Sequence, residues 1–422
     1  MDGGKMTDIK AIKKELRKEL SFSLGDDDKL TEAMVRDRVS RIFEYWEKER
    51  NRVIEATAKE KILQELCDEF LGMGPLKDLM ADPAVTEIMI NGPQKVYIEK
   101  NGKKVSTEVT FDDETHLRHF VEKMLMPTGR RVDESYPYVD FALNDGSRVN
   151  VIIPPLSVGG ATVTIRKFLR SINQIEDLVG LGTIDQRMAD FLVACTRAKI
   201  NVLFSGATGS GKTTTLEVLS SYISPQERII VIEDTLELTL RQEHVVRLLT
   251  RPPNIEGKGT VEIRDLFINT LRMRPTRIIL GEIRGAEAMD YLQALNSGHR
   301  GCLAVIHAST PLDALTRLET TALYAGLYMP VWAIRKQITS GVDLIVQHDQ
   351  LTDGSRKITY MTEVERMEGE EIILRDIFRY EIEDIDDEGK VRGKFSVKNV
   401  PTFFHLFKKK GVELNESIFK EK

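Results

Sequence analysis

One short stretch of the sequence carries residue types that are suited to binding phosphate. Residues 206–213 read Gly-Ala-Thr-Gly-Ser-Gly-Lys-Thr and match the pattern G-x-x-x-x-G-K-[ST]. The glycines allow a turn whose backbone N–H groups surround phosphate oxygens, and a following helix adds its positive N-terminal end. Lys212 would contact the β- and γ-phosphates, while the Thr213 hydroxyl would ligate Mg²⁺. We therefore predict a nucleotide-phosphate site at Gly206, Ala207, Thr208, Gly209, Ser210, Gly211, Lys212, Thr213 and Thr214.

Acidic residues follow a second apolar run, RIIVIED, which ends in Glu233 and Asp234 and leads on to Glu237. In a doubly wound sheet, ligands bind at the carboxyl ends of the strands, so these acids would face the phosphates. A carboxylate at that place can orient water or hold the water shell of a metal ion. The alternative is a solvated acidic loop that has no chemical role.

Two further runs end in residues that can act on a phosphate. RIILGE ends in Glu282, after a glycine where nucleotide-hydrolysing proteins normally carry a magnesium-binding Asp. We interpret Glu282 as the group that orients or deprotonates the attacking water, assisted by Glu233, because Thr213 can hold the metal directly. GCLAVIHAST places His307 at another strand end, with His299 just before that strand. A lone histidine there is often structural, but its place beside the other strand ends favours a γ-phosphate sensor.

The elements that must position these residues follow from the same runs. Segments long enough for crossover helices separate NVLFSG, RIIVIED, RIILGE and GCLAVIH, a pattern typical of buried parallel strands. The predicted fold class is α/β: a RecA-like P-loop ATPase core of mainly parallel sheet, an α+β N-terminal domain and a helical N-terminal extension. The predicted parts are a helical region at 1–72, the α+β domain at 73–168, a linker at 169–182, the P-loop domain at 183–348 and a C-terminal β/helical subdomain at 349–422.

Composition narrows the possible functions. The chain has 60 Lys and Arg against 66 Asp and Glu, a net charge of −6, whereas nucleic-acid binders usually carry a basic footprint. Its three cysteines form no C-x-x-C pair, so we expect buried thiols rather than a disulfide framework or a zinc site. The start of the sequence lacks the apolar segment of a signal peptide, and no apolar run reaches membrane-spanning length. We expect a cytoplasmic protein that contacts the membrane only through a partner.

The order of these motifs resembles the secretion-type ATPases, the hexameric motors of type II and type IV secretion and of type IV pili. IEDTLEL, RMRPTRIILGEIRGAEA and NSGHRGCLAVIHASTPLDALTRLE carry the resemblance after the P-loop. INGPQKVYIEKNGK, GRRVDESYPYVD, LNDGSRVNVIIPP and VTIRKF are most similar to the CpaF-type ATPases of the Tad (Flp pilus) system. Thr276 and Ser309 depart from the family pattern, and the C-x-x-C zinc element of the type II and pilus-extension branches is missing.

The resemblance implies further residues, ligands and partners. ATP and Mg²⁺ would be the ligands, and arginines of the N-terminal domain would contact the nucleotide: Arg148, Arg166 and, as a weaker candidate, Arg131. The chain would form a homo-hexamer that drives assembly of a Tad or type IV-like pilus, with retraction or type II-like secretion also open, through an inner-membrane platform protein. It would lie at the inner face of the cell membrane and bind no nucleic acid. The alternatives are a type IV conjugation or effector-secretion ATPase, a DNA-translocating motor, and a scaffold that binds ATP without hydrolysing it.

Overall fold

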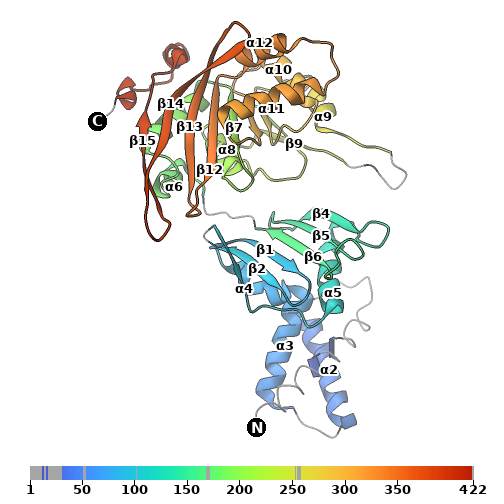
Figure 1. Ribbon diagram of the computed structural model, residues 1–422. Helices are drawn as coiled ribbons and strands as arrows, with labels where there is room; N and C mark the ends of the chain where they lie inside the picture. The colour runs from blue at the N-terminus through green and yellow to red at the C-terminus, as the bar shows by residue number, and fades with distance from the viewer. Residues whose placement is uncertain are drawn as a thin grey trace. The chain divides into compact units, whose positions relative to one another are not determined.

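The chain folds as two units, residues 1–169 and 170–422 (Figure 1). The computed structural model describes residues 12–13, 16–17, 31–50, 54–100, 102–167, 172–251, 253 and 258–420. Most of the first thirty residues of the predicted helical region and residues 169–171 of the predicted linker lie outside these ranges.

The first unit begins with two helices that share an apolar core. They are α2 (Glu32–Arg50) and α3 (Ala56–Leu71). Apolar residues recur at helical spacing in both, and Val39, Phe43 and Leu66 are buried between them. Thr31 precedes α2, and its hydroxyl accepts a hydrogen bond from the Met34 backbone N–H at 3.3 Å, as expected of an N-cap residue.

The rest of the first unit is an antiparallel six-stranded sheet in the order β3-β2-β1-β6-β5-β4. Its strands are β1 (Val85–Asn91), β2 (Val96–Lys100), β3 (Lys103–Ser106), β4 (Tyr138–Ala142), β5 (Arg148–Ile152) and β6 (Thr162–Arg166). Tight turns join β2 to β3 and β4 to β5, and Gly102 and Gly146 in these turns have positive φ. The main helix, α5 (Glu114–Leu125), is capped by Asp113 and packs on the sheet core. Short helices complete the unit: η1 (Gly74–Leu76), α4 (Lys77–Ala81) and η2 (Met126–Thr128).

The second unit is built on one nine-stranded sheet in the order β15-β14-β13-β12-β7-β11-β10-β8-β9. From β12 to β9 every neighbouring pair is parallel, which confirms the predicted fold class. The strands are β7 (Val202–Gly206), β8 (Ile229–Glu233), β9 (Val245–Leu249), β10 (Arg277–Leu280), β11 (Leu303–Ile306), β12 (Leu344–Gln350), β13 (Arg356–Glu368), β14 (Glu371–Ile385) and β15 (Val391–Val397). Strands β13–β15 of the predicted C-terminal subdomain extend this same sheet beyond β12, and each of them pairs antiparallel with the strand before it.

Helices cover both faces of this sheet, which explains why its central strands are apolar throughout. One face packs against α6 (Ile175–Gly180), α7 (Gln186–Arg197) and α8 (Lys212–Ser220). The other packs against α9 (Ile263–Thr270), α10 (Glu287–Asn296), α11 (Pro311–Leu323) and α12 (Val331–Gly341). The chain ends in η3 (Thr402–Phe404), α13 (His405–Lys409) and η4 (Glu416–Phe419).

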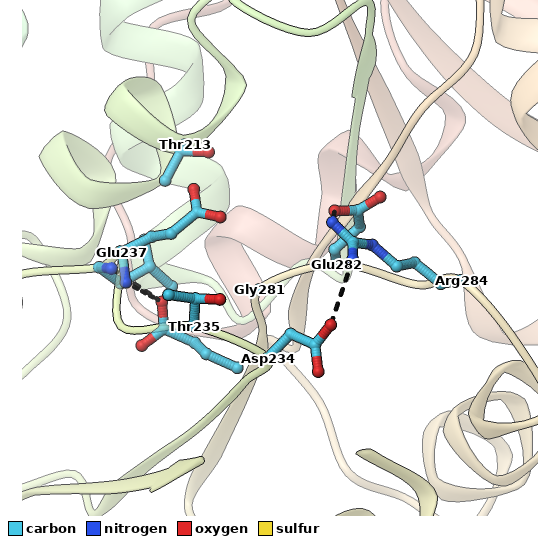
Figure 2. A pocket seen from close by; sticks show the side chains of 9 residues that line it. Thr213, Asp234, Thr235, Glu237, Gly281, Glu282 and Arg284 are labelled. Atoms are coloured by element: carbon cyan, nitrogen blue, oxygen red, sulfur yellow. Dashed lines mark hydrogen bonds and ion pairs between the residues drawn. The ribbon is translucent and has the colours of Figure 1, made fainter. Parts of the chain in front are cut away.

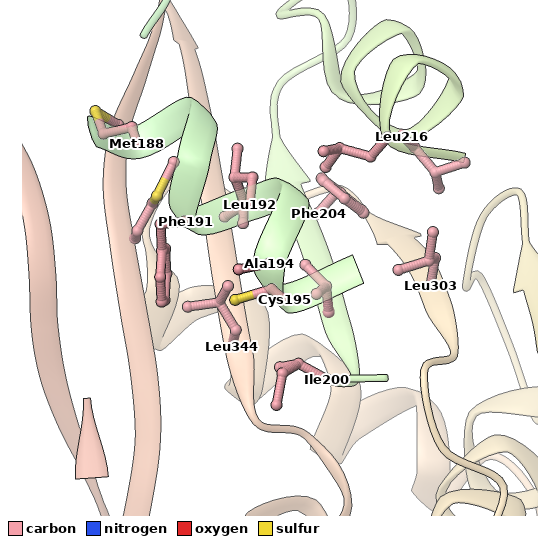
Figure 3. Close-up of a cluster of buried hydrophobic side chains, with 14 of the residues drawn as sticks. Met188, Phe191, Leu192, Ala194, Cys195, Ile200, Phe204, Leu216, Leu303 and Leu344 are labelled. Carbon is pink, nitrogen blue, oxygen red and sulfur yellow. The ribbon is translucent and has the colours of Figure 1, made fainter. Parts of the chain in front are cut away.

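Figure 3 shows the core on the first of these faces, where Phe191 and Cys195 of α7 pack among Phe204 and Leu344 of the sheet. The three cysteines are free and buried, as the sequence predicted. Across the described ranges, no helix combines the length and the apolar character needed to cross a bilayer.

Candidate functional site

The phosphate-binding loop connects β7 to α8, as the motif requires. Gly206, Gly209 and Gly211 have φ angles of 147°, 79° and 101°, in the region that favours glycine. A Cβ atom at Gly206 would collide with the carbonyl oxygen of His348 on the neighbouring strand β12. The turn therefore favours glycine at all three positions, and the close packing of β12 excludes a side chain at Gly206.

Lys212 begins α8 and has only 5% of its surface exposed. Its ammonium group donates hydrogen bonds to the carbonyl oxygens of Gly206 at 2.9 Å and Ala207 at 2.7 Å. His348 is fully buried beside it, and both its ring nitrogens lack a hydrogen-bond partner. Burial lowers the pKa of His348 to about 3, and the nearby charge of Lys212 acts in the same direction. His348 is therefore neutral and leaves Lys212 as the charged group beneath the loop.

A pocket at the carboxyl edge of the sheet brings the predicted acidic residues together with the end of the loop. Figure 2 shows its side chains converging from α8 and from the segments that follow β8 and β10. The lining residues are Thr213, Glu233, Asp234, Thr235, Glu237, Leu238, Gly281, Glu282 and Arg284. The convergence follows from the parallel topology, because the carboxyl ends of parallel strands share one edge. Hydroxyl and carboxylate oxygens are also the donors that Mg²⁺ prefers, so this lining fits the predicted metal.

Glu233, at the end of β8, is 2% exposed. Its Oε1 accepts hydrogen bonds from the backbone N–H groups of Glu237 at 2.9 Å and Leu238 at 2.8 Å. Its Oε2 is buried without a partner. Burial raises the pKa of this carboxyl to about 7, and the two backbone hydrogen bonds only partly oppose the rise. Glu233 thus combines an unsatisfied oxygen with a pKa near neutrality, which suits a group that accepts a proton.

Glu282 has a different electrostatic environment. Its Oε2 lies 2.6 Å from Nη2 of Arg284, and its Oε1 lies 3.2 Å from Nε2 of His307, the first residue after β11. Burial alone would raise the pKa of Glu282, but the hydrogen bonds from His307 and Arg284 outweigh it and hold the pKa at about 2. Arg284 also donates to Asp234 at 3.1 Å, so one cation joins the ends of β8 and β10. Glu282 is a fixed negative charge within a hydrogen-bonded network.

Gly281 occupies the position where the sequence lacks the expected Asp. A Cβ atom there would lie 3.0 Å from Cγ of Glu233 and 3.3 Å from the carbonyl oxygen of Ile232. Glycine at this position therefore allows β10 to pass close to the Glu233 side chain. A side chain at 281 would therefore press on Glu233 and shift it from its present position.

The chain is similar in sequence to proteins of a known family. The sequence pattern of the family described as Type II/IV secretion system protein matches residues 69–372. The chain belongs to this family. This confirms the predicted resemblance at the level of the secretion ATPase superfamily, whereas the CpaF-type branch stays a prediction.

Two relatives of this secretion-family protein match it over most of their own length. It is 32% identical over 306 residues to VirB11 of Agrobacterium fabrum, which covers 64% of this chain and 87% of that protein. It is 31% identical over 313 residues to a Mycobacterium tuberculosis protein named for conjugal transfer, covering 73% of this chain and 88% of that protein. A solved structure of the VirB11 ATPase from the Brucella suis type IV secretion system, in complex with sulphate, is 27% identical. It covers 72% of this chain and 96% of that chain, with a TM-score of 0.38.

The predicted site residue His299 does not line the pocket of the secretion-family protein. It precedes β11 and so lies at the end of that strand opposite to His307. Its Nδ1 lies 3.3 Å from the Ala294 carbonyl oxygen and 3.3 Å from the Ser297 hydroxyl, at the end of α10. These contacts give His299 a structural role in closing the helix.

The three predicted arginines all belong to the first unit. Arg148 on β5 and Arg166 on β6 are directly opposed cross-strand partners. Nε of Arg166 lies 3.8 Å from Oε1 of Glu87. Arg131 lies outside the strands, where its guanidinium is 3.3 Å from Asp133 and 5.5 Å from the ring centroid of Tyr136. Arg131 thus contacts residues close to it in sequence, and Arg148 and Arg166 lie opposite each other on neighbouring strands.

Sequence reasoning missed three basic residues close to the site: Arg284, His348 and Arg356. Arg284 stands two residues after Glu282, so a basic residue following a strand-end acid was an available signal. Arg356 begins β13, and its Nε donates to the Gly209 carbonyl oxygen at 2.7 Å. Nothing in the local sequence of His348 or Arg356 points to the loop, because their proximity depends on β12 pairing with β7.

Proposed function

We propose that this secretion-family protein is an ATPase that hydrolyses Mg-ATP at the pocket between the P-loop and Glu233, Glu282 and His307. The observation that carries the proposal is the convergence of Thr213, at the end of the loop, with the strand-end carboxylates on one pocket. A loop that only bound a nucleotide would not need a buried carboxylate of raised pKa beside it.

Binding of the phosphates rests on the loop and on Lys212. The backbone N–H groups from Gly206 to Thr214 and the N-terminal end of α8 would surround the phosphate oxygens. Lys212 would exchange its hydrogen bonds with the Gly206 and Ala207 carbonyl oxygens for contacts with the β- and γ-phosphates. Thr213 would hold Mg²⁺, which, when bound, offsets the negative charge of the phosphates.

The two glutamates take different roles in this proposal. Glu233 accepts the proton of the attacking water, because its Oε2 is unpartnered and its pKa is about 7. Glu282, with its pKa held at about 2, stays ionised and orients the water together with His307. This reverses the emphasis of the sequence interpretation, in which Glu282 was the main base and Glu233 its assistant. Asp234 and Glu237 act indirectly, by holding Arg284 and Glu233 in place.

Arg148 and Arg166 are proposed as the arginines that contact the nucleotide. Cross-strand partners point to the same face of a sheet, so an anion bound there would be attracted by both guanidinium groups. Guanidinium groups offset charge that develops on a transferred phosphoryl group, which can be worth roughly 10³–10⁵ in rate. Arg131 is the weaker candidate, because Asp133 and Tyr136 already hold its side chain.

At the cellular level we propose a homo-hexamer at the inner face of the cell membrane. ATP hydrolysis would drive assembly of a Tad or type IV-like pilus, or type II-like secretion, through an inner-membrane platform protein. A type IV conjugation or effector-secretion ATPase is the second candidate, and the similarity to VirB11 and to a conjugal transfer protein favours it. Stimulation of ATP turnover by the pilus platform protein, compared with a type IV secretion inner-membrane protein, separates these two. Stimulation by DNA alone would instead favour the DNA-translocating motor.

Phosphate release by the purified full chain tests the activity itself. The unaltered protein should release phosphate from Mg-ATP, and Lys212→Ala should lose nucleotide binding, turnover or both. Lys199→Ala is a matched control, because Lys199 pairs with Glu227 before β7, at the opposite edge of the sheet. Equal turnover in Lys212→Ala and the unaltered chain would show that the site assignment is wrong.

A further inference from the structure

The first residues of β13 contact two functional segments at once. Nε of Arg356 donates to the Gly209 carbonyl oxygen of the P-loop at 2.7 Å. The next residue, Lys357, donates from Nζ to the Gly182 carbonyl oxygen at 2.5 Å. Neighbouring residues of a strand point to opposite faces, so one strand end reaches both the loop and the segment at Gly182. Ile358 adds a backbone hydrogen bond to Thr183 at 3.0 Å.

This strand end is firmly attached to the P-loop strand. Strand β12 pairs in parallel with β7, with His348 opposite Gly206. Strand β13 pairs with β12 in turn, with Ile358 opposite His348. On β12, Gln347 donates to the carbonyl oxygens of Ala308 at 3.3 Å and Ser309 at 3.1 Å, directly after His307. The β12–β13 pair thus contacts the P-loop, the loop that carries His307 and the segment at Gly182.

Gly182 is the last residue of the predicted linker, whose described residues, 172–182, belong to the second unit and include α6. It has a φ of 66°, and a Cβ atom there would lie 3.2 Å from Nζ of Lys357. The ammonium group of Lys357 also lies 5.5 Å from the ring centroid of Tyr380 on β14. Lys357 is therefore held between the linker and the antiparallel part of the sheet.

We propose that Arg356 and Lys357 are positioning residues that couple nucleotide occupancy of the P-loop to the linker segment 172–183. Bound phosphates engage the backbone around Gly209, Arg356 follows that carbonyl, and the shift of the β13 end reaches Gly182 through Lys357. The proposal rests on ATP binding at the P-loop. Without the Lys357 contact, the segment at Gly182 should therefore respond less to the nucleotide.

Hydrogen exchange of the full chain, with and without the non-hydrolysable analogue AMP-PNP and Mg²⁺, tests the coupling. Two peptides report the outcome: one spanning 203–216 at the P-loop and one spanning 172–185 at the linker. In the unaltered chain AMP-PNP should slow exchange in both peptides, by about fivefold or more at the linker. In Lys357→Met the P-loop peptide should keep its response, and the linker response should fall below about twofold.

Two variants separate coupling from simple structural support. Arg356→Gln leaves the Lys357–Gly182 contact in place but should still abolish the linker response, and it carries the test if Lys357→Met unfolds. Lys357→Arg, which retains a cationic donor, should restore the response. Lys390→Met, an exposed lysine just before β15, is the matched control and should behave like the unaltered chain.

The outcomes distinguish this inference from the proposed function. A normal linker response in both Lys357→Met and Arg356→Gln would overturn the coupling, as would an unaltered chain in which only the P-loop peptide responds. Failure of the P-loop peptide of the unaltered chain to respond to AMP-PNP would instead contradict nucleotide binding itself.

Discussion

Among the described residues that line the pocket, only Glu233 combines deep burial, an unpartnered Oε2 and a pKa near neutrality. Replacing Glu233 by Gln removes this carboxylate. The rise of this pKa from 4.5 to about 7 corresponds to about 3 kcal/mol that disfavours the ionised carboxyl. Gln keeps the shape of the side chain but cannot accept the proton. We therefore expect kcat to fall by roughly 10²–10⁴, the usual contribution of a positioned general base.

The pKa of Glu233 also predicts how the turnover of the unaltered chain depends on pH. A base works only when ionised, so turnover should rise with pH through the pKa of Glu233. At a pKa of about 7, roughly a tenth of the carboxyl groups are ionised at pH 6 and roughly nine tenths at pH 8. kcat/KM, which reports groups of the free enzyme, should therefore increase about tenfold over this range.

Glu282→Gln is the matched comparison, because it changes the second glutamate of the same pocket by the same atoms. The pKa of Glu282 is about 2, so this carboxyl is ionised throughout the pH range of the assay. The Glu282→Gln variant should turn over more slowly but keep the rise in kcat/KM near pH 7. Loss of that rise in Glu282→Gln, together with near-normal turnover in Glu233→Gln, would refute the assignment and make Glu282 the base.

Two further predictions concern the arginine pair and Gly281. Arg148→Ala and Arg166→Ala should lower kcat more than ATP affinity, with Arg131→Ala as the milder control; equal losses in kcat and affinity would indicate simple ground-state binding. Gly281→Ala should push on Cγ of Glu233, 3.0 Å from the new Cβ atom, and lower turnover while leaving ATP affinity within about threefold. Steady-state kinetics and a fluorescent ATP analogue measure both quantities, and normal turnover in Gly281→Ala would show that Glu233 does not need its buried position.

The parts of the site that depend on local sequence were predictable. The P-loop is a continuous motif between an apolar run and a helix, so the sequence alone specified Lys212 and Thr213. The placement of Glu233, Glu282 and His307 at one edge of the sheet was also predictable, because each stands at the end of an apolar run and parallel topology brings such ends together. The same reasoning does not transfer to His299, which stands before its strand and therefore lies at the other edge.

Other features depend on which strands become neighbours, and sequence patterns do not give that order. Strand β9 was not predicted, because VVRLL is short and half-exposed at the edge of the sheet. His348 and Arg356 reach the P-loop only because β12 pairs with β7 and β13 with β12. The pKa difference between Glu233 and Glu282 could not be predicted from the sequence either, because it arises from burial and from the Arg284 and His307 contacts.

A crystal structure of the full chain with Mg²⁺ and a non-hydrolysable ATP analogue tests the central claim most directly. We predict that the Lys212 ammonium leaves the Gly206 and Ala207 carbonyl oxygens to contact the phosphates, and that the γ-phosphate lies between Lys212, Glu282 and His307. A water molecule within hydrogen-bond distance of both Oε2 of Glu233 and the γ-phosphate should complete the site. An analogue bound without contact to Lys212, or with its γ-phosphate remote from both glutamates, would contradict the account.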